Sequence, residues 1–161
     1  MHIDRLDADL IDLLTTHPQL PLIECARRLG VARGTVAARL ERLQSRGVIR
    51  GIVPDVDPAG LGYGLVAFCT VQIIQSAGQE AVVGALGEAI PEIVDLYTVT
   101  GDADLLLRLV TPDTDRLQEV MDRIALVPGV ARCSSSIALR RHLQGRLLPL
   151  VHRAAERGAV G

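Results

Sequence analysis

Apolar side chains in the first part of the chain recur every three or four positions, which is the spacing of amphipathic helices. In the first of these helices the apolar stripe consists of Leu6, Leu10, Leu13 and Leu14. The elements expected in this half are helices over residues 4–16, 22–29 and 32–46 and a short strand over residues 49–53. Gly30 and Gly47 follow the second and third helices, as glycine often does at helix C-termini.

The second half of the chain alternates between apolar, β-rich runs and helical spacing. The expected elements are a strand over 65–74, a helix over 79–90, strands over 93–100 and 104–110, a helix over 114–126 and a strand over 130–139. The order βαββαβ predicts a four-stranded antiparallel sheet with both helices on one face, the ferredoxin-like arrangement. The open face of this sheet carries many apolar residues, which favours dimerisation through the sheet.

A turn-rich stretch, DVDPAGLGYG, separates the two patterns. We therefore expect an α+β protein with a helix-turn-helix domain over residues 1–53, a linker over 54–64, a ferredoxin-like domain over 65–140 and a basic tail over 141–161. The tail shows no sustained period. The linker glycines have the spacing GxGxG and lead into a strand, not a helix, which argues against a dinucleotide-binding loop.

Charge is distributed unevenly along the chain, although the net charge is only −2. Residues 22–53 hold seven arginines against two glutamates, a local net charge of +5. Residues 55–122 hold twelve acidic residues against two arginines, a local net charge of −10. A basic segment joined to an acidic one indicates that the basic segment binds phosphate groups and that the acidic segment has a different function.

Several function classes find no support in the sequence. The three cysteines (Cys25, Cys69 and Cys133) are far apart, and the four histidines lack metal-ligand spacing, so neither a metal site nor a cofactor is expected. No catalytic constellation is present, and no apolar run is long enough to span a membrane. The three aromatic residues offer no stacking platform for RNA. We expect a cytoplasmic, nucleoid-associated protein that is not an enzyme.

The two helices around Gly30 have the layout of a helix-turn-helix, whose second helix enters the major groove of duplex DNA. Residues near the N-terminus of that helix reach deepest, and the candidates for base contacts are Arg33, Thr35 and Arg39. The candidates for phosphate contacts are Arg42, Arg46 and Arg50, with Arg27 and Arg28 bracing the DNA backbone from the preceding helix. The alternative is a solvated arginine face on an ordinary helical bundle.

The second candidate site is the turn TVTGDAD at residues 98–104. A glycine turn exposes N–H groups that bind a carboxylate, while Asp102 and Asp104 suit an ammonium group, so together they match the zwitterion of an amino acid. The alternative is a plain β-hairpin whose Gly-Asp pair serves only the turn. Hydroxyls follow on the last strand at Ser134, Ser135 and Ser136, of which alternate members face opposite sides of the sheet.

Four segments of the chain resemble the Lrp/AsnC family of leucine- and asparagine-responsive, or feast/famine, transcription regulators. They are LDADLIDLL, ARRLGVARGTVAARLERLQSRGVIRGI, VTGDADLLLRL and VPGV. The resemblance implies a winged-type helix-turn-helix joined to a ligand-binding ferredoxin-like domain, and dimers that often assemble into octamers. It also implies amino-acid or related effectors held between dimers near the glycine-aspartate hairpin. The effector candidates here are Thr98, Thr100, Gly101, Asp102, Asp104, Ser134 and Ser136.

Two positions depart from the family pattern. Ala32 stands where the family usually has a serine that caps the recognition helix, and Gly34 lies in the first turn of that helix. The hypothesis from sequence is a regulator that binds duplex DNA as a homo-oligomer and responds to an amino-acid-like effector. Two alternatives remain: an architectural DNA-binding protein without an effector, and a metabolite-binding or catalytic domain with a vestigial helix-turn-helix.

Overall fold

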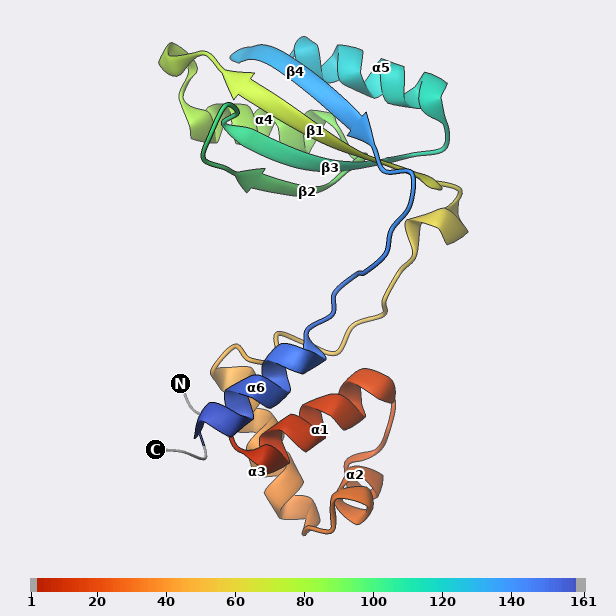
Figure 1. Ribbon diagram of the computed structural model, residues 1–161, viewed down its shortest axis with the longest axis vertical. Helices are drawn as coiled ribbons and strands as arrows, with labels where there is room; N and C mark the ends of the chain where they lie inside the picture. Colours follow the sequence, from red (N-terminus) through yellow and green to blue (C-terminus); the bar gives the residue numbers. More distant parts are fainter. Residues whose placement is uncertain (1–2, 159–161) are drawn as a thin grey trace. The chain divides into compact units, whose positions relative to one another are not determined.

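A computed structural model describes residues 3–158. The chain divides into two compact units (Figure 1). Met1–Pro54 and Leu143–Gly161 form the first, here called the helical unit, and Asp55–His142 form the second, called the sheet unit. Among the described residues, no helix is long and apolar enough to cross a membrane, and no cluster of side chains is suited to hold a metal ion.

The helical unit consists of α1 (Arg5–Thr16), α2 (Leu22–Leu29), α3 (Arg33–Ser45) and α6 (Leu148–Gly158). The first three confirm the helices predicted from the apolar spacing. Their inward side chains form one core, in which Leu10, Val36 and Leu43 are buried. Gly30 follows α2 with a φ of +66°, a left-handed conformation that favours glycine and turns the chain sharply into α3.

One expectation for this unit is wrong. Residues 49–53 form no strand, because the described part of this unit contains no other strand to pair with them. The Val48 and Ile49 N–H groups instead donate to the carbonyl of Leu43 at the end of α3. The tail, which shows no sustained period in the sequence, contains α6, and this helix packs against α1 (Figure 1). A short apolar period was present in Leu148, Val151 and Ala155, but it covers only two turns.

The sheet unit confirms the predicted ferredoxin-like order. Its elements are η1 (Pro58–Leu61), β1 (Leu65–Ile73), η2 (Gln75–Ala77), α4 (Gln79–Ala89), β2 (Ile93–Thr98), β3 (Leu105–Thr111), α5 (Thr114–Ala125) and β4 (Val130–Ile137). The strands pair antiparallel in the order β2-β3-β1-β4. Helices α4 and α5 cover one face of the sheet (Figure 1), where alternate strand residues such as Cys69, Val71 and Leu107 are fully buried.

The opposite face of the sheet has no covering helix within this unit. Phe68 and Tyr97 remain 43% and 55% exposed there, which makes an open, partly aromatic surface. The register also sets Thr70 opposite Ser134 and Gln72 opposite Arg132 on this face. Polar side chains of β1 and β4 are therefore adjacent at one end of the open face.

Candidate DNA-binding surface and effector pocket

Helices α2 and α3 meet across the tight turn that a helix-turn-helix requires. The N–H of Val31 donates to the carbonyl of Ala26, which closes the turn after Gly30. Helix α3 begins after Ala32, and no side chain caps its first turn. The first N–H groups of α3 are therefore not bound by a capping side chain, as the missing serine at this position predicts.

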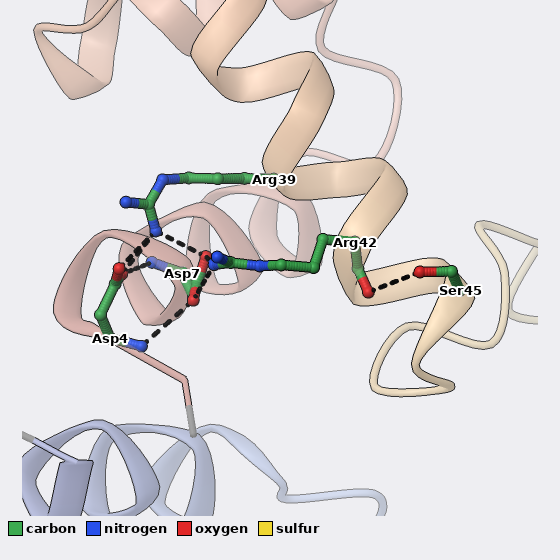
Figure 2. A network of polar contacts seen from close by, with 5 residues as sticks. All are labelled: Asp4, Asp7, Arg39, Arg42 and Ser45. Atoms are coloured by element: carbon green, nitrogen blue, oxygen red, sulfur yellow. Dashed lines mark hydrogen bonds and ion pairs between the residues drawn. The ribbon is translucent and has the colours of Figure 1, made fainter. Parts of the chain in front are cut away.

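Two arginines of α3 bind the N-terminus of α1 (Figure 2). Arg39 Nη1 donates to both carboxylate oxygens of Asp4, at 2.7 and 2.6 Å, and to Oδ1 of Asp7 at 2.8 Å. Arg42 Nη2 donates to both oxygens of Asp7 at 2.7 Å. The two aspartates also form a capping box, in which each carboxylate accepts the backbone N–H of the other residue.

This ionic network gives two of the predicted DNA contacts partners within the protein. Asp7 is only 1% exposed, so its carboxylate depends on the arginines for charge compensation. The sequence predicts a base contact for Arg39 and a phosphate contact for Arg42, whereas both guanidinium groups bind carboxylates of α1 and its N-cap in the structure. The partners lie 32 and 35 residues away along the chain, so the sequence alone did not reveal them.

The other predicted DNA contacts lie on the surface of the helical unit. Arg33, Thr35, Arg46 and Arg50 are exposed, and among the described residues none of the three arginines has an acidic partner. Arg27 and Arg28 differ, because both donate to Glu24 on their own helix. The hydrogen bonds from Arg27 and Arg28 lower the pKa of Glu24 to about 2, so this pairing persists at neutral pH.

Acid is expected to weaken the α1–α3 network. Burial by itself would raise the pKa of Asp4, but hydrogen bonds from Arg39 and from the Asp7 backbone outweigh it and lower that pKa below 3.8. A carboxyl with a lowered folded-state pKa stabilises the fold above its unfolded pKa and loses that contribution as the pH falls through the folded value. Urea midpoints measured from pH 6 downward should therefore fall more steeply below about pH 4 for the wild type than for Asp4→Asn. Equal slopes would contradict this role of Asp4.

The predicted effector hairpin is tied to strand β1 through Asp104. Its Oδ2 accepts the N–H of Ile73 at 2.7 Å, and its own N–H donates to the carbonyl of Val71 at 3.0 Å. Gly101 has a φ of +115°, which other residues adopt only under strain. Gln72 Nε2 donates to the Asp102 carbonyl at 2.7 Å, so β1 holds the hairpin at two points.

An open pocket of about 180 Å³ lies beside this hairpin at the polar end of the open sheet face. It is lined by Thr70, Gln72, Asp102, Ala103, Arg132, Cys133 and Ser134. Two of the predicted effector residues, Asp102 and Ser134, therefore line it, whereas Thr98, Thr100, Gly101, Asp104 and Ser136 do not. Sequence reasoning missed Arg132, Thr70 and Gln72. The pairing of β1 with β3 places Thr70 and Gln72 beside the hairpin, and the pairing of β1 with β4 adds Arg132.

Comparison with known protein families agrees with this two-part arrangement. The model of the Lrp/AsnC ligand binding domain matches residues 66–148, and the model of the winged helix-turn-helix DNA-binding domain matches residues 3–50. The chain belongs to the Lrp/AsnC family. It is accordingly a DNA-binding transcriptional regulator, whose helix-turn-helix match spans α1 to α3 and whose ligand-binding match includes all four strands of the sheet unit.

Individual Lrp/AsnC proteins resemble the chain over most of its length. The HTH-type transcriptional regulator FL11 of Pyrococcus horikoshii is 32% identical over 148 residues, which cover 92% of this chain and 97% of FL11. The structure of E. coli AsnC superposes with a TM-score of 0.84 at 24% identity, covering 92% of this chain and all of that one. A transcriptional regulator from Neisseria meningitidis in complex with L-methionine has a TM-score of 0.81 at 25% identity, covering 94% and 99%.

Proposed function

We propose that this Lrp/AsnC protein binds specific duplex operators through α3 and that an amino-acid effector in the sheet unit modulates this binding. The observation that carries the DNA-binding half is the exposed surface of α3, whose arginine at the first helical position has no acidic partner among the described residues. Arg33 and Thr35 contact base edges, and Arg46 and Arg50 contact phosphates. Arg27 and Arg28 brace the backbone, whereas Arg39 and Arg42 are left out of this set because they hold α1.

The effector half rests on the charges that line the pocket. Arg132 supplies a cation for a carboxylate, and Asp102 supplies an anion for an ammonium group. The same pocket is also lined by the hydrogen-bonding side chains of Thr70, Gln72 and Ser134. This combination suits the zwitterion of an amino acid, and the Neisseria relative was solved with L-methionine. The pocket is open, which fits a site that is completed by a neighbouring dimer.

The oligomer is the part of the proposal that links the two sites. The open sheet face with Phe68 and Tyr97 offers an apolar surface for a homodimer, and dimers assemble further into octamers. An effector bound between dimers changes their packing and thereby the number of DNA half-sites that are engaged at once. Such a protein acts on the chromosome in the cytoplasm.

Calorimetry with the twenty amino acids, L-methionine included, tests the effector site on the full-length protein. One or a few of them are expected to bind the wild type, and Arg132→Ala is expected to weaken binding at least about tenfold by removing the carboxylate partner. Asp104→Ala is also expected to abolish the response while DNA binding survives, because the Ile73 N–H loses its acceptor and the hairpin shifts. Asp104→Asn keeps an acceptor oxygen and serves as the matched control.

The same experiment separates the alternatives. Heat from none of the amino acids would favour an architectural DNA-binding protein without an effector. Binding that is unchanged in Arg132→Ala and Asp104→Ala would place the effector site elsewhere.

A further inference from the structure

The outward face of α3 carries small side chains. Helix α3 turns Val36 and Leu43 into the core, where they are 1% and 2% exposed. Gly34, Thr35 and Ala38 are exposed in its first two turns. Because Arg39 binds Asp4 and Asp7, Arg33 is the one cation in these two turns of the described structure that is not directed to another helix.

The composition of this face limits the ways in which it recognises bases. The first nine residues of α3 are RGTVAARLE, which include neither asparagine nor glutamine, the side chains that form paired hydrogen bonds with adenine. Arginine forms the corresponding pair with guanine, and Arg33 is placed to do so. The methyl groups of threonine and alanine make apolar contacts with the C5-methyl group of thymine. Guanine and thymine are thus the bases that Arg33, Thr35 and Ala38 are equipped to recognise, while Glu41, the last of the nine residues, offers an acceptor for cytosine.

Gly34 lies on the same face of α3 and carries no side chain. Glycine weakens a helix relative to alanine, because it has no side chain that restricts the backbone. Gly34 does not have a positive φ, and a Cβ built on it would meet nothing within 4 Å among the described residues. Neither the conformation nor the packing of the helical unit therefore explains it. Gly84 of α4 shares both properties, so Gly34 is distinguished by its place on the exposed face of α3, where the missing Cβ lets the backbone approach a ligand closely.

We infer that α3 selects its operator largely through thymine methyl groups, which Thr35 and Ala38 contact while Gly34 allows the helix backbone to approach the base edges. Arg33 adds recognition of a neighbouring guanine. The inference rests on the proposed entry of α3 into the major groove and names the base chemistry that is recognised there. It makes Gly34, Thr35 and Ala38 specificity-determining residues of this chain.

Deoxyuridine tests the inference directly, because it differs from thymidine only by the missing C5-methyl group. The full-length protein first selects its preferred duplex from a random library, and single thymidines in that duplex are then replaced by deoxyuridine. Replacement at the contacted positions is expected to weaken binding about fourfold per methyl group, as for one buried methylene. Replacement at the other thymidines is expected to have no effect.

Two variants of Thr35 assign the contact to a side chain. Thr35→Ser removes only the methyl group and is expected to abolish the difference between thymidine and deoxyuridine at one position. Thr35→Val keeps a methyl group in the same place and is expected to retain that difference. The affinities for the thymidine and deoxyuridine duplexes are compared for the same protein variant. A substitution that weakens binding to both duplexes equally therefore does not change the result.

Gly34→Ala should have effects of opposite sign on stability and DNA binding. It is expected to raise the melting temperature, because alanine favours the helix and its Cβ meets no neighbour, and to weaken binding to the selected duplex. The matched control is Gly84→Ala in α4, which also meets nothing within 4 Å and should stabilise its unit without changing DNA affinity.

The outcomes separate this inference from the proposed function. Sequence-selective binding that is insensitive to deoxyuridine at every position, or Gly34→Ala with undiminished affinity, would overturn the thymine-methyl inference and leave the regulator intact. Failure to select any duplex would overturn both.

Discussion

Replacing Arg39 and Arg42 together by alanine is expected to destabilise the helical unit by about 3–5 kcal/mol, the cost of removing the partners of a buried charge. Asp7 would keep a single donor, the N–H of Asp4, for a carboxylate that is 1% exposed. Hydrogen exchange measured by mass spectrometry should then show amides of α1 and α3 exchanging about 100- to 5,000-fold faster. Amides of α4 and α5 provide the internal control and should not change.

A triple variant distinguishes this role from DNA contact. Adding Asp7→Ala to the double variant removes the buried carboxylate that has lost its arginine partners. This third substitution is expected to restore part of the protection of α1 and α3 amides from hydrogen exchange. Unchanged exchange in α1 and α3 of the double variant, together with lost DNA binding, would contradict the structural role. It would return both arginines to the DNA surface that the sequence first indicated for them.

Replacing Arg33, Arg46 and Arg50 together by alanine is expected to weaken DNA binding about 100-fold at about 0.15 M salt, because each arginine contributes on the order of 1 kcal/mol. The plot of log affinity against log salt should also become shallower by about 2 to 3, since fewer counterions are released. All three side chains are exposed and have no acidic partner among the described residues, so the fold should persist.

The control for this variant carries the same change in charge on the same unit. Arg146, Arg153 and Arg157 are exposed residues at the C-terminal end of the chain, outside the helix-turn-helix. Their replacement by alanine is expected to change DNA affinity far less. An equal loss in both triple variants would contradict the assignment of the DNA-binding surface to α3 and the segment after it.

Much of the fold was predictable from periodicity. The bounds of α2 agree with the prediction, and the alternation of strands and helices specified the ferredoxin-like order, because both patterns depend on local spacing. The segment 49–53 was mistaken for a strand, since an apolar run shows the tendency to extend but not whether a partner strand is present. Helix α6 was missed because its apolar period covers too few turns.

The candidate sites were only partly predictable, because their missing parts depend on tertiary contacts. One feature of the sequence was compatible with the ionic network between α1 and α3. Two carboxylates, Asp4 and Asp7, are three residues apart, and so are two arginines, Arg39 and Arg42. That spacing is compatible with pairing between helices but does not show that α1 meets α3. Arg132 enters the effector pocket only through the register of β1 and β4, which is set by the folded sheet.

The central claim is that this protein recognises specific duplex DNA through an arginine-bearing recognition surface. Its most direct test is equilibrium binding of the full-length protein to the DNA immediately upstream of its own gene, against a shuffled duplex of the same composition, across a salt series. The account predicts tight binding to the upstream DNA, weaker binding to the shuffled duplex and a steep loss of affinity with salt. Absence of binding to either duplex at low salt would contradict it.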